Sequence, residues 1–219
     1  MNARQFTVLV SVVAVLTIGL GAFYAWARYW GPHSRSVSLG ASGGPDAVVA
    51  IGQPLPRITL KDIDGETLDL QSARGRMVVL LVQGNACPCS AAYIPRMNTL
   101  AKTYGPRGVD VWAFNSNVNE TEEETRANAR KRNVLYRVAH DPESRVADIL
   151  GAACTTEVWV VDRQGVLQYH GRIDDNIYKP EKVQRRDLQA ALDALLDGRP
   201  APTPETQAFA CTIVREGGV

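Results

Sequence analysis

Apolar and amphipathic stretches alternate along the chain from about residue 51 onward. The continuous apolar run Met77–Val82 is typical of a strand covered on both faces, and a second strand is predicted over Val109–Asn115. Amphipathic segments predict helices over about 88–104, 143–150 and 181–196, and a further helix from a cap at Asn119 to Asn133. A hairpin is predicted around Asp64-Gly65, and a strand pair over 157–161 and 166–170. This alternation predicts an α/β domain with a central mixed β-sheet flanked by helices.

The first 50 residues follow a different pattern. The segment Phe6–Ala27 contains 22 residues without a charge, nearly all of them apolar. As a helix it would be about 33 Å long, which is enough to cross a bilayer. Because Ala25-Trp26-Ala27 also fits a cleavage site, a removable signal peptide is the alternative. We predict a transmembrane signal anchor over residues 1–30 and a flexible linker rich in Gly and Ser over residues 31–50.

An anchor of this kind usually exports the chain that follows it. We therefore expect the globular part to lie in the periplasm or another extracytoplasmic space, attached to the membrane by its amino-terminal helix. The 24 Lys and Arg residues nearly balance the 23 Asp and Glu residues, giving a formal charge of +1. Such a balance creates no field that would attract nucleic acid, so we expect no nucleic-acid partner.

The globular part is predicted as one domain over residues 51–197, followed by a tail over residues 198–219. The chain of 219 residues is 45% hydrophobic, which is enough to bury one core. Three prolines, at positions 200, 202 and 204, stiffen the start of the tail. Four cysteines are too few for a disulfide scaffold, so each needs a local explanation.

The candidate chemistry lies at Cys87-Pro88-Cys89, between the apolar strand and the helix over residues 88–104. Proline is favoured at the first helical position, so Pro88 places Cys87 at the helix N-cap. There the helix dipole and free backbone N–H groups favour a thiolate over a thiol. The thiolate is both the nucleophilic and the metal-binding form of cysteine. Cys87 and Cys89 are therefore the candidate catalytic residues.

These residues carry a resemblance to a known family. A strand, a cysteine at a helix start and Pro95 eight residues later resemble the thioredoxin fold. The segments Cys87–Tyr93 and Gly151–Asp162 resemble bacterial redoxins of the alkyl hydroperoxide reductase and thiol-specific antioxidant superfamily. The resemblance covers about residues 51–197. It implies a thioredoxin-like fold and redox chemistry that requires no cofactor, on a protein or small-molecule thiol or disulfide.

Three positions depart from the motifs of that superfamily. Gly84 stands where the peroxidases carry a threonine ahead of the cysteine that attacks peroxide. Ser90 stands where thioredoxins carry the second cysteine of C-x-x-C. Thr156 stands where thioredoxins carry the cis-proline that faces the active site. The resemblance still implies that the Thr156 loop approaches Cys87 and supports its oxidised form.

Cys154 precedes that loop, so the fold would place it near Cys87 as a buried small residue, a resolving cysteine or a metal ligand. It stands eleven residues before Gly165, as a ligand histidine does before the corresponding glycine in Sco-type copper chaperones. Three thiolates suit Cu(I) better than hard divalent ions. A Cu(I)-binding metallochaperone that uses Cys87, Cys89 and Cys154 is therefore the alternative function.

Cys211 lies in the tail, where a structural tether, a resolving cysteine and an unpaired thiol all stay open. The leading hypothesis is a membrane-anchored, exported thiol–disulfide oxidoreductase. In it the Cys87 thiolate attacks, and Cys89 or another cysteine (Cys154 or Cys211) resolves the mixed intermediate. A thiol peroxidase with antioxidant activity is a third hypothesis.

Overall fold

A five-stranded mixed sheet forms the centre of the computed structural model, which describes residues 49–217. The strands lie in the order β5-β4-β3-β6-β7. Strands β3, β4 and β5 run parallel, whereas β6 is antiparallel to β3, and β7 is antiparallel to β6. The strands are β3 (Met77–Val82), β4 (Val109–Asn115), β5 (Arg137–His140), β6 (Val158–Val161) and β7 (Leu167–Gly171). The predicted central mixed sheet is thereby confirmed.

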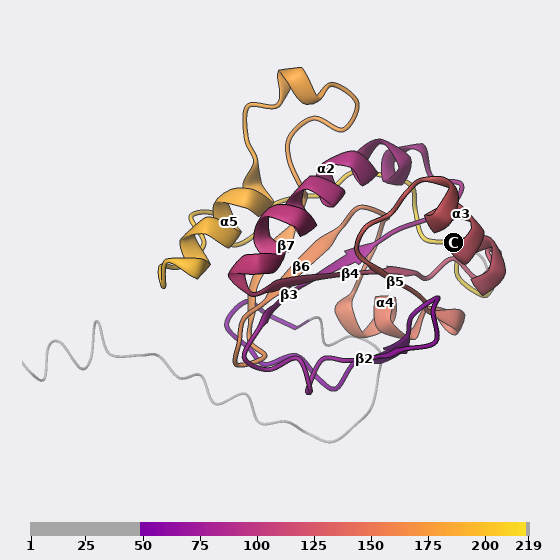
Figure 1. The fold of residues 1–219 in the computed structure, drawn as a ribbon, viewed down its shortest axis with the longest axis horizontal. Helices are drawn as coiled ribbons and strands as arrows, with labels where there is room; N and C mark the ends of the chain where they lie inside the picture. The colour runs from indigo at the N-terminus through magenta and orange to yellow at the C-terminus, as the bar shows by residue number, and fades with distance from the viewer. Residues whose placement is uncertain (1–48, 218–219) are drawn as a thin grey trace, which may run out of the picture. The chain divides into compact units, whose positions relative to one another are not determined.

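Helices cover both faces of this sheet. One face carries α2 (Pro88–Tyr104), α3 (Glu122–Lys131) and α5 (Asp187–Leu196). The other face carries α4 (Arg145–Leu150) and a separate hairpin of β1 (Thr59–Lys61) and β2 (Thr67–Asp69). Figure 1 shows α2 and α5 on one side of the sheet and α4 on the other. Short 3₁₀ turns lie at Gly105–Arg107, Pro142–Ser144 and Pro180–Lys182.

Strand β3 explains why the sheet needs two covering layers. All six of its side chains are buried. Met77, Val79 and Leu81 join the core beneath α2 and α5, whereas the alternate residues face α4 and the hairpin. Successive side chains of a strand point to opposite faces, so a continuous apolar run requires cover on both. This central strand carries the chain directly to Cys87.

Three helix starts differ from the predictions. Helix α4 begins at Arg145 and not at residue 143, because Glu143 and Ser144 have positive φ values and belong to a separate 3₁₀ turn. The last helix begins at Asp187 and not near residue 181, because Pro180–Lys182 forms a separate turn and Val183 is extended. The third helix is capped by Thr121 and not by Asn119. The Thr121 hydroxyl accepts from the Glu124 backbone N–H, and the Glu124 carboxylate accepts from the Thr121 backbone N–H. This reciprocal pair lies two residues further along than the sequence pattern suggested.

The predicted membrane anchor, residues 1–30, and nearly all of the predicted linker lie outside the described residues. Between residues 49 and 217, no helix combines the length and the apolar character that a bilayer crossing requires.

A core substitution tests the packing of α5 on the sheet. Leu192 is fully buried in the core beneath α2 and α5, whereas Leu135 is half exposed. We expect Leu192→Ala to lower the free energy of unfolding by about 2–5 kcal/mol, because it removes buried methyl groups and leaves a cavity. The matched change Leu135→Ala should cost less than about 0.5 kcal/mol. Urea unfolding followed by circular dichroism measures both, and equal effects would contradict this packing.

Candidate functional site

Cys87 is the N-cap residue of α2, as the sequence predicts. Its backbone is extended, Pro88 occupies the first helical turn, and the Ser90 backbone N–H donates to Cys87 Sγ over 3.4 Å. A cap accepts from backbone N–H groups that have no partner within the helix. A sulfur in this position is therefore placed to carry negative charge.

The loop before Cys87 is held by a carboxylate from another element. The backbone N–H groups of Asn85 and Ala86 donate to the two oxygens of Glu120 at 2.8 and 2.9 Å. The side chain of Asn115, at the end of β4, also donates to Glu120 over 2.7 Å. Glu120 therefore fixes the loop that leads to Cys87.

Gly84 occupies a position without room for a side chain. A Cβ atom there would lie 2.9 Å from Asn117 Nδ2, 3.2 Å from the Thr155 methyl group and 3.3 Å from the Cys87 Cβ. The departure from the peroxidase motif therefore has a steric reason, since neighbouring side chains fill the space that a threonine would need.

A second loop, between α4 and β6, lies against Cys87. The Thr155 hydroxyl is 3.0 Å from Cys87 Sγ, and Thr156 follows with a φ of 65°. The Thr156 backbone N–H donates to the Val82 carbonyl at the end of β3 over 2.7 Å. Glu157 accepts from the backbone N–H groups of Ala153 and Cys154, and pairs with His170 at 2.7 Å. The predicted approach of this loop to Cys87 is confirmed, but the contacting side chain is Thr155.

The carboxy-terminal tail brings a second sulfur to the site. Cys211 Sγ lies 2.8 Å from Cys87 Sγ, and the two sulfurs share a hydrogen bond. The Cys211 carbonyl accepts from the Thr155 backbone N–H over 2.9 Å. Further along, Ile213 is buried in the core between the sheet and α4, and the Val214 backbone N–H donates to Asn117 Oδ1. Contacts on both sides of Cys211 thus fix it beside Cys87.

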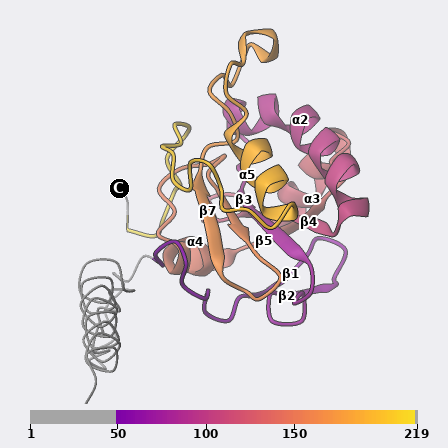
Figure 2. The ribbon, with the colours of Figure 1, turned by 90° about the vertical axis from the view of Figure 1, so that its left-hand side faces the viewer.

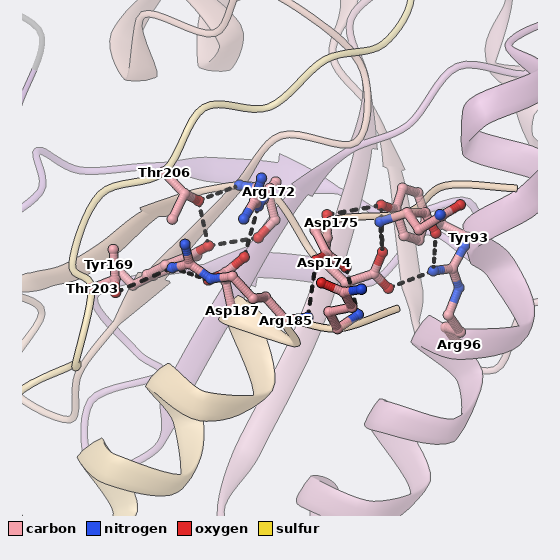
Figure 3. A network of polar contacts seen from close by, with 12 residues as sticks. Tyr93, Arg96, Tyr169, Arg172, Asp174, Asp175, Arg185, Asp187, Thr203 and Thr206 are labelled. Atoms are coloured by element: carbon pink, nitrogen blue, oxygen red, sulfur yellow. Dashed lines mark hydrogen bonds and ion pairs between the residues drawn. The ribbon is translucent and has the colours of Figure 1, made fainter. Parts of the chain in front are cut away.

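The start of the tail is fastened to the edge of the sheet. Thr206 Oγ1 accepts from the Arg172 backbone N–H over 3.0 Å and shares a hydrogen bond with the Tyr169 hydroxyl (Figure 3). Arg172 also pairs with Asp187 at the start of α5. Gly171 has a φ of 143°, and a Cβ atom there would collide with Thr206. A glycine is therefore required where the tail crosses β7.

Cys89 lies in the first turn of α2, close to the other two sulfurs. The Sγ atoms of Cys87, Cys89 and Cys211 all lie within 4.8 Å of one another. The Tyr178 hydroxyl is 3.2 Å from Cys89 Sγ, and it comes from the loop between β7 and α5 that projects from the domain in Figure 2. The sequence predicted a cluster of Cys87, Cys89 and Cys154. In the structure, the third sulfur close to those of Cys87 and Cys89 is that of Cys211. Cys154 is half-buried, and its backbone forms a β-bridge with Thr212 of the tail.

The pKa values of three cysteines are shifted from the ordinary thiol value, and the shifts differ in direction. Burial opposes ionisation of Cys87, but hydrogen bonds from Cys211, Thr155 and the Ser90 backbone outweigh it and lower its pKa to about 7. Burial, together with the hydrogen bond to Cys87 and its charge, raises the pKa of Cys211 to about 12. Burial and the Glu157 charge raise the pKa of Cys154 to about 11. Of these three thiols, Cys87 is therefore the one that ionises most readily near neutral pH.

A comparison with family models places this arrangement in a family. The model described as the AhpC/TSA family matches residues 51–170, which is more than half of the chain. The chain belongs to the AhpC/TSA family. The resemblance to redoxins that the Cys87 and Gly151–Asp162 segments carried is confirmed, and the matched range contains Cys87, Cys89 and Cys154 but not Cys211.

Similar sequences include thiol-disulfide oxidoreductases and peroxiredoxins. Thiol-disulfide oxidoreductase ResA of Halalkalibacterium halodurans is 29% identical over 118 residues, which cover 53% of this chain and 58% of that protein. Chloroplastic peroxiredoxin Q of Triticum aestivum is 26% identical over 159 residues, which cover 69% of each chain. The match therefore spans little more than half of the first relative.

Solved structures agree on the fold of this AhpC/TSA member. A hypothetical protein from Sinorhizobium meliloti 1021 has a TM-score of 0.71 and 27% sequence identity, covering 78% of this chain and 98% of its own. The thioredoxin domain of a thiol-disulfide oxidoreductase from Bacteroides vulgatus has a TM-score of 0.51 and 17% identity, covering 61% and 96%. The fold is thioredoxin-like, as predicted.

Three residues of this site were missed by sequence reasoning. Thr155, Glu120 and Tyr178 contact Cys87, the loop before it, and Cys89 respectively. Only Thr155 had a signal, since it adjoins the position where thioredoxins carry their cis-proline. Glu120 and Tyr178 lie in stretches whose charge and turn residues carry no indication of a distant sulfur.

The acidity of Cys87 can be tested by alkylation. In reduced protein, the rate of iodoacetamide labelling at Cys87 should rise with pH through a midpoint near 7, following its pKa of about 7. We expect Thr155→Val to raise that midpoint by about 1–2 units, since a hydrogen bond to a charged group contributes about 1.5–3 kcal/mol and one pKa unit is about 1.36 kcal/mol.

Peptide mass spectrometry after short labelling assigns the rate to Cys87 alone. Thr212→Val is the matched control, because Thr212 is exposed and adjoins Cys211. The control should keep the midpoint near 7. A wild-type midpoint near the ordinary thiol value of 9 would contradict the assignment.

Proposed function

We propose that this protein is a membrane-anchored, exported thiol–disulfide oxidoreductase in which Cys87 attacks and Cys211 resolves. The single observation that carries the proposal is the 2.8 Å separation of these two sulfurs at the start of α2. Membership of the AhpC/TSA family and the name of the ResA relative support the reaction class. No cofactor is needed for this chemistry.

The reaction consists of two exchanges. The Cys87 thiolate attacks one sulfur of a substrate disulfide, forms a mixed disulfide and displaces the first substrate thiolate. Cys211 then loses its proton, attacks Cys87 Sγ and displaces the second substrate thiolate. The substrate gains two electrons and becomes a dithiol, while Cys87 and Cys211 form a disulfide. The same steps in reverse oxidise a substrate dithiol.

The acidities of the two sulfurs suit this order. With Cys87 ionised, Cys211 keeps its proton, because burial, the hydrogen bond to Cys87 and the charge on Cys87 raise the pKa of Cys211 to about 12. In the mixed disulfide Cys87 carries no charge and no longer accepts as a thiolate. Two of the causes that hold the proton on Cys211 are then lost, so its pKa falls when it must attack.

Cys89 and Cys154 are less suited to resolve. Cys89 shares its hydrogen bond with the Tyr178 hydroxyl, and Cys154 has a pKa raised to about 11 by burial and the Glu157 charge. The substrate is proposed to be a protein or small molecule that carries a thiol or disulfide. The Tyr178 and Phe209 side chains are 61% and 65% exposed. The Tyr178 hydroxyl contacts Cys89, and Phe209 shortly precedes Cys211 in the sequence, so apolar surface is available near the reacting sulfurs.

Trapping of the mixed disulfide tests the division of roles. Cys211→Ser should accumulate a mixed disulfide with a model disulfide substrate, because the second attack is lost. Cys87→Ser should form no adduct and lose exchange activity by at least about 1000-fold, since the nucleophile is removed. Cys154→Ser serves as the matched control and should turn over normally. Non-reducing gels and mass spectrometry of the linked peptides read the result.

The oxidised wild-type protein should contain one cross-link, between the peptides of Cys87 and Cys211. A Cys87–Cys89 link in its place, together with normal turnover of Cys211→Ser, would contradict the role of Cys211.

Membrane attachment rests on the apolar segment Phe6–Ala27. Expressed in a Gram-negative bacterium, the full chain should sediment with membranes at high salt, and its globular part should be digested when the periplasm is opened to protease. A chain lacking residues 1–30 should stay in the cytoplasmic fraction. Protection of the globular part from protease would contradict export, and release by high salt would contradict the anchor.

A further inference from the structure

Three cysteine sulfurs meet at a spacing that suits one bound metal ion. The Sγ atoms of Cys87, Cys89 and Cys211 lie within 4.8 Å of one another, and those of Cys87 and Cys211 are 2.8 Å apart. Metal–sulfur bonds of about 2.3 Å place three ligands of a planar site about 4 Å apart. The Cys87–Cys211 separation is below that value and no separation exceeds 4.8 Å, so the spacing is compatible with one ion held by all three sulfurs.

The donor set selects the kind of ion. Within residues 49–217, no histidine or carboxylate belongs to this group of three sulfurs. His140 Nε2 instead contacts the Glu120 carbonyl, and His170 pairs with Glu157. Structural zinc sites almost always use four ligands, whereas soft thiolates select Cu(I). We propose that Cys87, Cys89 and Cys211 bind one Cu(I) ion.

The tail is what completes this site. It holds Cys211 through the bond between the Thr155 N–H and the Cys211 carbonyl, and through the bond between the Val214 N–H and the Asn117 side chain. Burial of Ile213 fixes the same segment. Cys154 is held outside the group, where its backbone pairs with Thr212. The third ligand is therefore Cys211, in place of the Cys154 that the sequence suggested.

Two polar side chains orient the ligating sulfurs. The Thr155 hydroxyl is 3.0 Å from Cys87 Sγ, and the Tyr178 hydroxyl is 3.2 Å from Cys89 Sγ. Groups that hydrogen bond to metal ligands fix their orientation and tune metal affinity. Each thiol that ligates the ion releases its proton.

Metal binding and disulfide exchange would compete for the same atoms. A disulfide between Cys87 and Cys211 leaves one sulfur of the three, so the oxidised protein should bind no Cu(I). This dependence on redox state rests on the proposed function. The three-sulfur site of the reduced protein does not.

Competition for Cu(I) tests the site. The anaerobically reduced full chain in detergent is titrated with Cu(I) in the presence of bicinchoninate, whose coloured complex reports the free ion. We expect one Cu(I) per chain. The variants Cys87→Ser, Cys89→Ser and Cys211→Ser should each lose at least about 100-fold in affinity for Cu(I). Changing a residue that only supports a metal ligand costs about 10–100-fold, and removal of a ligand should cost at least as much.

The matched control is Cys154→Ser, which should bind Cu(I) as the wild type does. Circular dichroism of each variant establishes that it is folded, and X-ray absorption of the copper-loaded wild type should report three Cu–S bonds. Undiminished binding by folded Cys211→Ser, or a loss confined to Cys154→Ser, would overturn the proposed ligand set. Stoichiometric retention of Zn(II) in preference to Cu(I) would overturn the choice of ion.

The same preparations separate this proposal from the proposed function. If the reduced chain holds Cu(I) on three sulfurs but no link between Cys87 and Cys211 forms on oxidation, the exchange mechanism fails and the metal site stands. If that link forms but the reduced chain yields all its Cu(I) to the chelator, the metal site fails alone.

Discussion

The contact on which the site depends is the one between the tail and the Thr155 loop. Cys87 sits at the N-cap of α2 because of local sequence, but an N-cap sulfur needs a neighbouring thiol to resolve a mixed disulfide. The bond from the Thr155 N–H to the Cys211 carbonyl places a sulfur from 124 positions later in the chain against it. The loop that supplies the Thr155 hydroxyl to Cys87 therefore also positions Cys211. The same loop thus helps to lower the pKa of Cys87 and holds Cys211 beside it.

Much of this arrangement follows from sequence. The apolar run of β3 needs cover on both faces, which requires a layered α/β fold. Pro88 fixes the start of α2, and so places Cys87 at the cap. Both depend on residues close together in the chain, where backbone preference and periodicity decide the outcome. The start of α5 was predicted less well, because the 3₁₀ turn Pro180–Lys182 and the extended Val183 interrupt a segment of helix-forming composition.

The partners of the sulfurs could not be derived in that way. Cys211 reaches Cys87 only because Gly171 lets the tail cross β7 and because Ile213 finds a place in the core. Neither condition is visible near Cys211 in the sequence. Glu120 is equally remote from the cysteine loop that it holds. Contacts between distant segments are fixed by the packing of the whole domain, so residue spacing pointed to Cys154, the nearer cysteine of the loop.

The environment of Gly84 bears on the choice between disulfide and peroxide chemistry. In the peroxidase motif a threonine hydroxyl ahead of the attacking cysteine helps to bind peroxide. Here Asn117, Thr155 and Cys87 itself close the space around Gly84, and all three also contact the tail segment that carries Cys211. The residues that contact the tail thus also fill the volume that a peroxide-binding threonine would need. With no threonine hydroxyl at position 84 and the Cys211 thiol beside Cys87, this environment favours exchange between sulfurs over peroxide binding.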